Sequence, residues 1–140
     1  MSSATKACDV NPRVVLAWRL LAGAMALAIA VGSLLPSMPG AAAAFSDKVL
    51  HYLAYVALAL VFTAAFSRRH WLGIAVGLAV FGGAIELLQY WLPGKRSGEW
   101  LDMGANLAGI ATGLVAALAV PHSWRRHLDR LLGRPEAVDA

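Results

Sequence analysis

The chain has 140 residues, enough for one domain of ordinary size, and 59% of them are hydrophobic while only 14% are charged. About a quarter of the residues in a soluble domain are charged, so this deficit and the mean hydropathy of +0.63 indicate a protein that lies in lipid. The formal net charge is +4. The basic residues flank apolar runs and form no stripe with interleaved aromatics, which argues against a nucleic-acid-binding protein.

Four segments are long enough to cross a bilayer as α-helices, which takes roughly 20 mostly apolar residues. They are residues 14–35, 47–66, 71–92 and 102–120. Prolines or short polar segments separate them. The sequence therefore predicts an all-α integral membrane bundle of four transmembrane helices, in which short loops make successive helices antiparallel neighbours.

Two tails flank this predicted four-helix domain. Residues 1–13 contain the single cysteine, Cys8, which cannot form an internal disulfide. Residues 121–140 are basic and either form a short amphipathic helix on the membrane surface or act as a flank that stops translocation. A signal peptide is the alternative for the first run, but the run is longer than the usual h-region of about 7–15 residues, so we expect a retained helix.

The distribution of lysine and arginine predicts the orientation of the bundle. Nine of these residues lie in the N-terminal tail, at the start of the first helix, in the second loop and in the C-terminal tail, whereas three lie at the other end. Because cytoplasmic segments carry the excess of positive residues, we expect both termini in the cytoplasm. The first and third loops then face outward, and Lys48, Lys95 and Arg96 lie at the outer end.

Polar residues inside the predicted helices gather at one depth. His51 and Asn106 each lie four residues into their helices from the outer end, and Glu86 lies six residues before the outer end of the third helix. At 1.5 Å per residue, each is about 6–9 Å below the outer boundary. The inner halves of the same helices contain no such residues, so the sequence predicts a one-sided polar layer.

The spacing of these residues predicts that they face one another. Asp47, His51 and Tyr55 recur every four residues, and Glu86 with Gln89 and Asp102 with Asn106 also share helix faces. Charged or amide groups that face lipid would cost several kcal/mol, so these faces should meet or line a wet cavity. The candidate ligand-binding residues are Asp47, Lys48, His51, Tyr55, Glu86, Gln89, Arg96, Asp102 and Asn106.

Such a set of carboxylates, amides, an imidazole and a guanidinium suits a polar head group, and Arg96 suits a phosphate or carboxylate. Interhelical hydrogen bonds that only hold the bundle, each worth about 0.6 kcal/mol, are an alternative. A membrane-embedded enzyme with Glu86 or Asp102 as base and His51 as its partner is another. Established reaction signatures are absent, so no catalytic residue is assigned. One histidine with carboxylates could hold a metal, but the spacing does not require one, and we expect neither a metal nor a cofactor.

Small residues recur at four-residue spacing in two of the predicted helices. Gly73 and Gly77 form a GxxxG motif in the third helix, and Ala105, Gly109 and Gly113 line one face of the fourth. Small residues let transmembrane helices approach closely. We expect both sets to serve helix packing and to have no chemical role.

Three segments of the chain resemble the VanZ-like family of small bacterial membrane proteins. They read "SLLPSMPG", "DKVLHYLAYVALAL" and "IELLQYWLPGKRSGEWLDMGANLAGIATG" and extend from about Ser33 to Gly113. The middle segment matches the family's D-K-x-x-H-x-x-x-Y element. The last matches its E-x-x-Q … R … D-x-x-x-N-x-x-G element.

This resemblance implies a multi-pass protein of the bacterial cytoplasmic membrane. The family is named for a member associated with resistance to the glycopeptide teicoplanin, and its biochemical activity is not settled. The resemblance therefore implies a role in the cell envelope and leaves the reaction open. The expected partners are membrane lipids or a lipid-linked envelope precursor, and no nucleic acid.

Overall fold

The computed structural model describes residues 12–35, 41–91 and 100–119, and side chains at all of these positions except 41–46. The described chain consists of α1 (Pro12–Leu34), α2 (Ala41–Ala65), the short 3-10 turn η1 (Arg68–His70), α3 (Trp71–Trp91) and α4 (Trp100–Ala119). Each of the four α-helices contains a segment long and apolar enough to cross a membrane. The prediction of an all-α bundle of four such helices is confirmed, and the chain has the character of a multi-pass membrane protein.

Three of the four α-helices begin earlier than the predicted apolar runs, and α3 begins at Trp71 as predicted. Pro12 is the first residue of α1, a position where the missing amide hydrogen of proline breaks no helical bond. The greatest difference is at α2, which begins at Ala41 and not at Asp47. Four consecutive alanines, the strongest helix formers, extend this helix beyond the segment that can span the membrane, which begins at Asp47.

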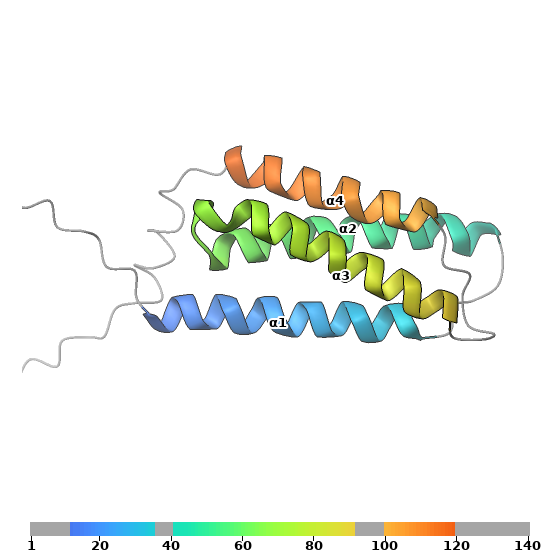
Figure 1. Cartoon of the computed structure of the whole chain (residues 1–140), viewed down its shortest axis with the longest axis horizontal. Coiled ribbons are helices and arrows are strands. Elements are labelled where there is room, and N and C mark those ends of the chain that lie inside the picture. Colours follow the sequence, from blue (N-terminus) through green and yellow to red (C-terminus); the bar gives the residue numbers. More distant parts are fainter. Residues whose placement is uncertain (1–11, 36–40, 92–99, 120–140) are drawn as a thin grey trace, which may run out of the picture.

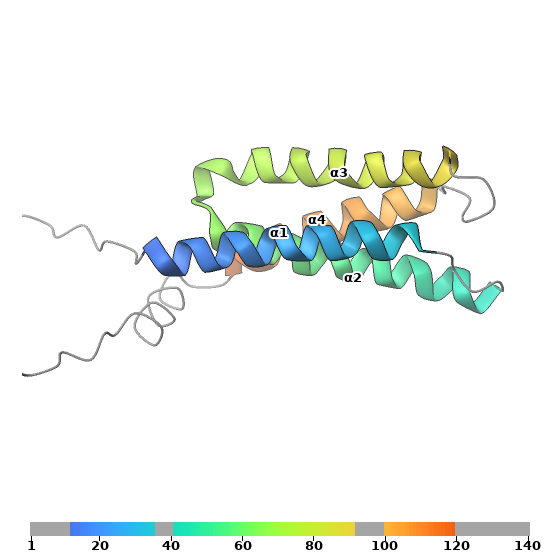
Figure 2. The same ribbon diagram turned by 90° about the horizontal axis from the view of Figure 1, so that it is seen from below.

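Successive helices run antiparallel, and α2 and α3 lie between α1 and α4 (Figure 1). Turning the bundle by 90° shows α1 lying along α2, with α3 on the opposite side of the view (Figure 2). The starts of α2 and α4 therefore lie at the same end of the bundle as the ends of α1 and α3. We call this the cluster end, and the other end, with η1 and the start of α1, the arginine end.

The most extensive contact joins α2 to α4, which are parallel and not successive. A β-carbon built on Gly109 would collide with the carbonyl oxygen of Tyr52, and one built on Gly113 would lie 2.7 Å from both Ala59 Cβ and the Val56 carbonyl oxygen. Glycine at these positions therefore lets the two backbones meet. The sequence predicted contacts between successive antiparallel helices, but it did not predict this contact between the parallel helices α2 and α4.

Most of the helical surface is apolar and exposed, as expected for a protein whose solvent is lipid. Only 11–33% of each candidate span is buried inside the chain. The small buried core contains Tyr55, Leu58, Ala59, Leu78 and Ile110 from α2, α3 and α4. The core thus lies among these three helices, and α1 packs against its edge.

Candidate functional site

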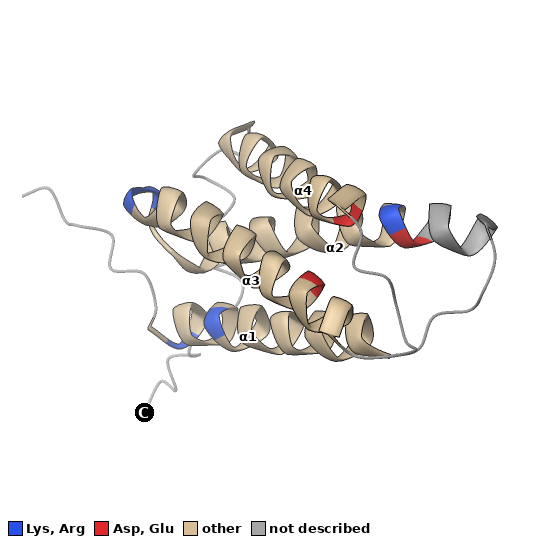
Figure 3. Ribbon diagram, turned by 45° about the vertical axis from the view of Figure 1, so that its right-hand side comes forward, with Lys and Arg blue, Asp and Glu red and all other residues tan. Residues whose placement is uncertain are grey.

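The two ends of the bundle differ in charge. In the ribbon of Figure 3 the acidic residues (red) of α2, α3 and α4 lie toward the cluster end, and lysine or arginine residues (blue) lie on α1 and in the η1 region toward the other end. Among the residues that the structure describes, Lys48 is the only lysine or arginine at the cluster end. The predicted one-sided layer of polar residues is therefore a feature of the fold.

Two polar contacts join α2 to α4 at this end. The Lys48 Nζ lies 3.2 Å from Asp102 Oδ1, and the His51 Nδ1 donates a hydrogen bond to Asn106 Oδ1 at 3.0 Å. These pairs follow one another by one turn on each helix, as the parallel arrangement requires. Asp102 is in the first turn of α4, where the helix dipole stabilises a carboxylate.

Two further carboxylates flank the imidazole of His51. Asp47 lies one turn earlier on α2, with its Oδ2 4.0 Å from His51 Nε2. Glu86 comes from α3, and its Oε1 lies 3.8 Å from His51 Nδ1. The structure thus brings six of the nine predicted residues into one group: Asp47, Lys48, His51, Glu86, Asp102 and Asn106. We call this group the polar cluster.

Two buried polar atoms next to His51 lack hydrogen-bond partners among the described residues: the hydroxyl of Tyr55, one turn further along α2, and the Nδ2 of Asn106, a member of the polar cluster. Tyr55 is 1% exposed and Asn106 is 0% exposed. A β-carbon at Gly82 of α3 would lie 2.9 Å from the Tyr55 hydroxyl and 3.1 Å from Asn106 Nδ2, so both atoms point toward this glycine. Gly82 was not predicted as a site residue, and the Gly82-Gly83 pair on the face of Glu86 is the signal that could have indicated it.

Gln89 lies apart from the polar cluster and contacts α1. Its side chain is buried, and its Nε2 donates a hydrogen bond of 2.7 Å to the carbonyl oxygen of Ser33. The last carbonyls of an α-helix have no partner within the helix, so Gln89 satisfies one of them near the end of α1. Gln89 shares a face with Glu86 but serves the α1–α3 contact.

Several predictions concern residues outside the described ranges. Arg96 and Lys95 lie between α3 and α4 in residues 92–99, and the C-terminal tail lies in residues 120–140. The proposed contact of Arg96 with a ligand and the surface helix of the tail stay predictions.

The two small-residue motifs differ in the structure. Gly109 and Gly113 lie against α2, as described above, whereas a β-carbon at Gly73 or Gly77 would meet nothing within 4 Å. Gly73 and Gly77 lie on the exposed face of α3. The expectation that they pack against another helix is therefore wrong within the described chain, because that face of α3 meets no other described helix.

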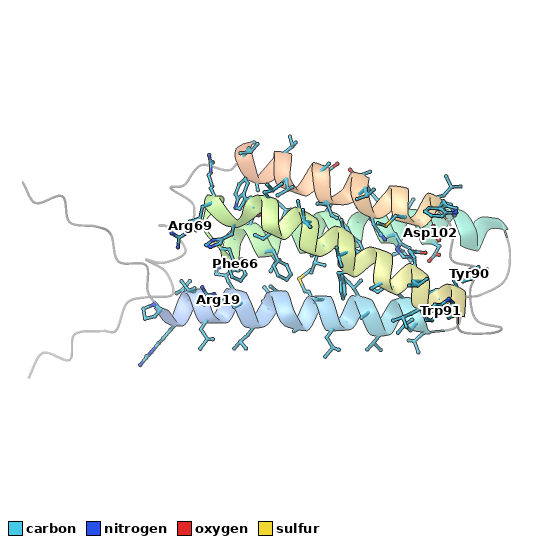
Figure 4. The ribbon with its side chains drawn as sticks, in the orientation of Figure 1. Arg19, Phe66, Arg69, Tyr90, Trp91 and Asp102 are labelled. Atoms are coloured by element: carbon cyan, nitrogen blue, oxygen red, sulfur yellow. The ribbon has the colours of Figure 1, made fainter. Side chains whose placement is uncertain are left out.

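The arginine end holds a pocket lined by α1, by the end of α2 and by η1. The Arg19 guanidinium carbon lies 5.0 Å from the centre of the Phe66 ring, a cation–π contact. Figure 4 shows Arg19, Phe66 and Arg69 together at this end, with Asp102, Tyr90 and Trp91 at the other. Tyr90, Trp91 and Trp100 are exposed at the cluster end, where aromatic side chains suit a membrane–water boundary.

Comparisons of the chain with family models, with curated proteins and with solved structures found no match. The function must therefore be argued from the polar cluster itself.

Proposed function

We propose that this chain is a multi-pass protein of the bacterial cytoplasmic membrane whose polar cluster binds the head group of a membrane lipid or of a lipid-linked envelope precursor. The observation that carries the proposal is the pair of buried, unpartnered polar atoms on Tyr55 and Asn106 beside the polar cluster. An unsatisfied polar atom within hydrocarbon costs several kcal/mol. A polar ligand or water that reaches these atoms would remove that cost.

The charge difference between the ends supports a site in the outer leaflet. Arg13, Arg19, Arg68 and Arg69 are all at the arginine end. An excess of positive residues is typical of the cytoplasmic side, so both termini belong there under this proposal. The polar cluster then lies a few ångströms inside the opposite surface, where lipid head groups are within reach.

The residues of the polar cluster suit particular chemical groups. The carboxylates of Asp47 and Glu86 accept hydrogen bonds from hydroxyl or ammonium groups. Lys48 is held by Asp102, and Arg96, whose planar fork suits phosphate, follows α3 in sequence. A head group with hydroxyl or amino groups and a phosphate matches this set.

The sequence resemblance supports placing the chain in the VanZ-like family, and this placement is part of the proposal. It adds the expectation that loss of the site changes susceptibility to teicoplanin. Binding, and not catalysis, is the role we assign, because no described pair of residues forms an established nucleophile–base arrangement.

A structural role for the polar cluster is the second candidate. It is favoured by the His51–Asn106 hydrogen bond and the Lys48–Asp102 ion pair, which both join α2 to α4. Under this alternative, polar substitutions would destabilise the bundle and have no separate effect on lipid binding.

Native mass spectrometry of the purified chain with envelope lipids separates the two candidates. Glu86→Gln and Asp102→Asn preserve side-chain size, and Thr63→Val is the matched control. Thr63 is buried on α2 but donates only to carbonyl oxygens of its own helix. We expect at least tenfold less retained lipid for the first two variants and wild-type retention for the control. The melting temperatures of Glu86→Gln and the control should be close to that of the wild type, whereas that of Asp102→Asn should fall because its ion pair with Lys48 is lost.

Wild-type lipid retention by Glu86→Gln and Asp102→Asn would contradict the proposal. A loss of retention that follows a loss of stability in every variant would support the structural role. The same variants, expressed at equal levels, should also change teicoplanin susceptibility of cells.

A further inference from the structure

The geometry points to a divalent metal site formed by Asp47, His51 and Asp102. Each of these residues offers a ligand atom, and the three atoms lie within 4.8 Å of one another. Imidazole nitrogen with carboxylate oxygens is a ligand set that suits zinc or manganese. Metal binding is a property separate from head-group binding, and it can be tested in the absence of any lipid.

The orientation of His51 is the first observation that favours an ion. Since Asn106 Oδ1 can only accept, the hydrogen bond of 3.0 Å assigns the proton of neutral His51 to Nδ1. The lone pair is then on Nε2, the nitrogen that lies 4.0 Å from Asp47 Oδ2. Metal-binding histidines are held in this way, with one ring nitrogen donating to an oxygen and the other on the metal.

Burial is the second observation. His51 and Asp102 are buried, and Asp47 is partly buried, so the three ligands are not an exposed acidic patch.

The three ligand atoms lie within 4.8 Å of one another and must draw closer together on binding. Two ligands of a tetrahedral zinc, each about 2.0–2.1 Å from the ion, are about 3.3 Å apart. The 4.0 Å between His51 Nε2 and Asp47 Oδ2 is longer by a fraction of an ångström. Side-chain rotation can supply that movement, because Asp47 and His51 are one turn apart on the same helix.

The neighbouring residues have defined roles in this site. Asn106, which accepts the Nδ1 proton, positions the imidazole, and Glu86 Oε1, 3.8 Å from His51 Nδ1 on the side away from the ion, adds negative charge near it. Lys48 competes with the ion for Asp102. Under the proposed function, the ion would also provide positive charge for a phosphate-bearing head group.

Metal binding by the full chain, purified without a histidine tag and stripped with a chelator, tests this inference. Zn²⁺ and Mn²⁺ are the probes, measured by calorimetric titration and by elemental analysis after dialysis. We expect one equivalent of at least one ion per wild-type chain. His51→Gln and Asp47→Asn should abolish it, and Glu86→Gln, which removes a negative charge near the imidazole, should weaken it with unchanged stoichiometry.

The other histidines provide the controls. The chain has four histidines, so His70→Gln and the double variant His122→Gln/His127→Gln should bind as the wild type does. Absence of stoichiometric binding to the wild type, or equal binding by His51→Gln, would overturn the inference. Loss of binding in the control variants alone would place the ion elsewhere and would also overturn it.

A measurement on the unsubstituted protein guards against variants that fail to fold. X-ray absorption of the loaded wild type should show one imidazole and otherwise oxygen donors at about 2.0–2.1 Å for zinc. Two or more imidazoles, or sulfur from Cys8, would contradict the assignment. Because these measurements use no lipid, their outcome does not depend on whether the chain binds a head group. Failure to bind a metal would likewise leave the lipid-retention experiment unaffected.

Discussion

Gly109→Ala is expected to destabilise the bundle by forcing α2 and α4 apart. The added β-carbon would collide with the Tyr52 carbonyl oxygen and lie 3.0 Å from Tyr55 Cβ. Carbon atoms in contact are about 3.5–4.0 Å apart, so α4 must move by about 0.5–1 Å. The His51–Asn106 bond of 3.0 Å would then approach or exceed the length limit of a hydrogen bond. Overpacking costs about 1–3 kcal/mol and a lost interhelical hydrogen bond about 0.6 kcal/mol, which gives about 1.6–3.6 kcal/mol, and the better helix propensity of alanine offsets up to about 1 kcal/mol of this.

Unfolding in mixed detergent micelles, followed by circular dichroism, measures this cost. Gly104→Ala on the same helix is the matched control, because its β-carbon would meet nothing within 4 Å. Alanine is the better helix former, so the control should be unchanged or more stable by up to about 1 kcal/mol. Equal stability of Gly109→Ala and Gly104→Ala would refute the claim that a glycine is required for the α2–α4 contact.

Three other variants test separate contacts by similar means. Lys48→Met should destabilise the chain by about 1–3 kcal/mol. This cost is below that of breaking a fully buried ion pair, because Lys48 is partly exposed. Adding Asp102→Asn should restore most of the lost stability. No recovery in that double variant would argue against the ion pair. Gln89→Leu should lower the free energy of unfolding by about 1 kcal/mol through the lost hydrogen bond to Ser33, and it should leave lipid and metal binding unchanged. A binding defect in this variant would show that Gln89 belongs to the binding site. In a Cys8→Ser background, Ser97→Cys should react with an impermeant thiol reagent in intact cells and Ser67→Cys only after lysis; the reverse pattern would invert the proposed orientation.

Hydropathy and helix periodicity were sufficient to predict the four helices and the shared depth of His51, Glu86 and Asn106. Depth is predictable because a membrane helix has a fixed rise and its ends are marked by polar residues. Facing follows from four-residue spacing together with the cost of exposing charge to lipid. These are local rules, and the polar cluster obeys them.

Contacts between helices required the structure. Gly73 with Gly77 and Gly109 with Gly113 have the same spacing, yet only the second pair meets another helix, because packing depends on which face the whole bundle covers. Gln89 shares a face with Glu86, but it lies one turn nearer the helix end, where the carbonyl of Ser33 is within reach. The early start of α2 likewise reflects alanine propensity beyond the membrane-spanning segment.

The glycine contacts make α2 and α4 move as one body. Because backbones in such close contact cannot slide without collisions, we expect Asp47, His51 and Asp102 to keep their mutual positions when the bundle moves. Glu86 is carried by α3, which meets this pair less extensively. A displacement of α3 would therefore change the contact between Glu86 and His51 and uncover the Tyr55 hydroxyl, while the three candidate metal ligands stay in register. Entry to the site is thus expected from the α3 side.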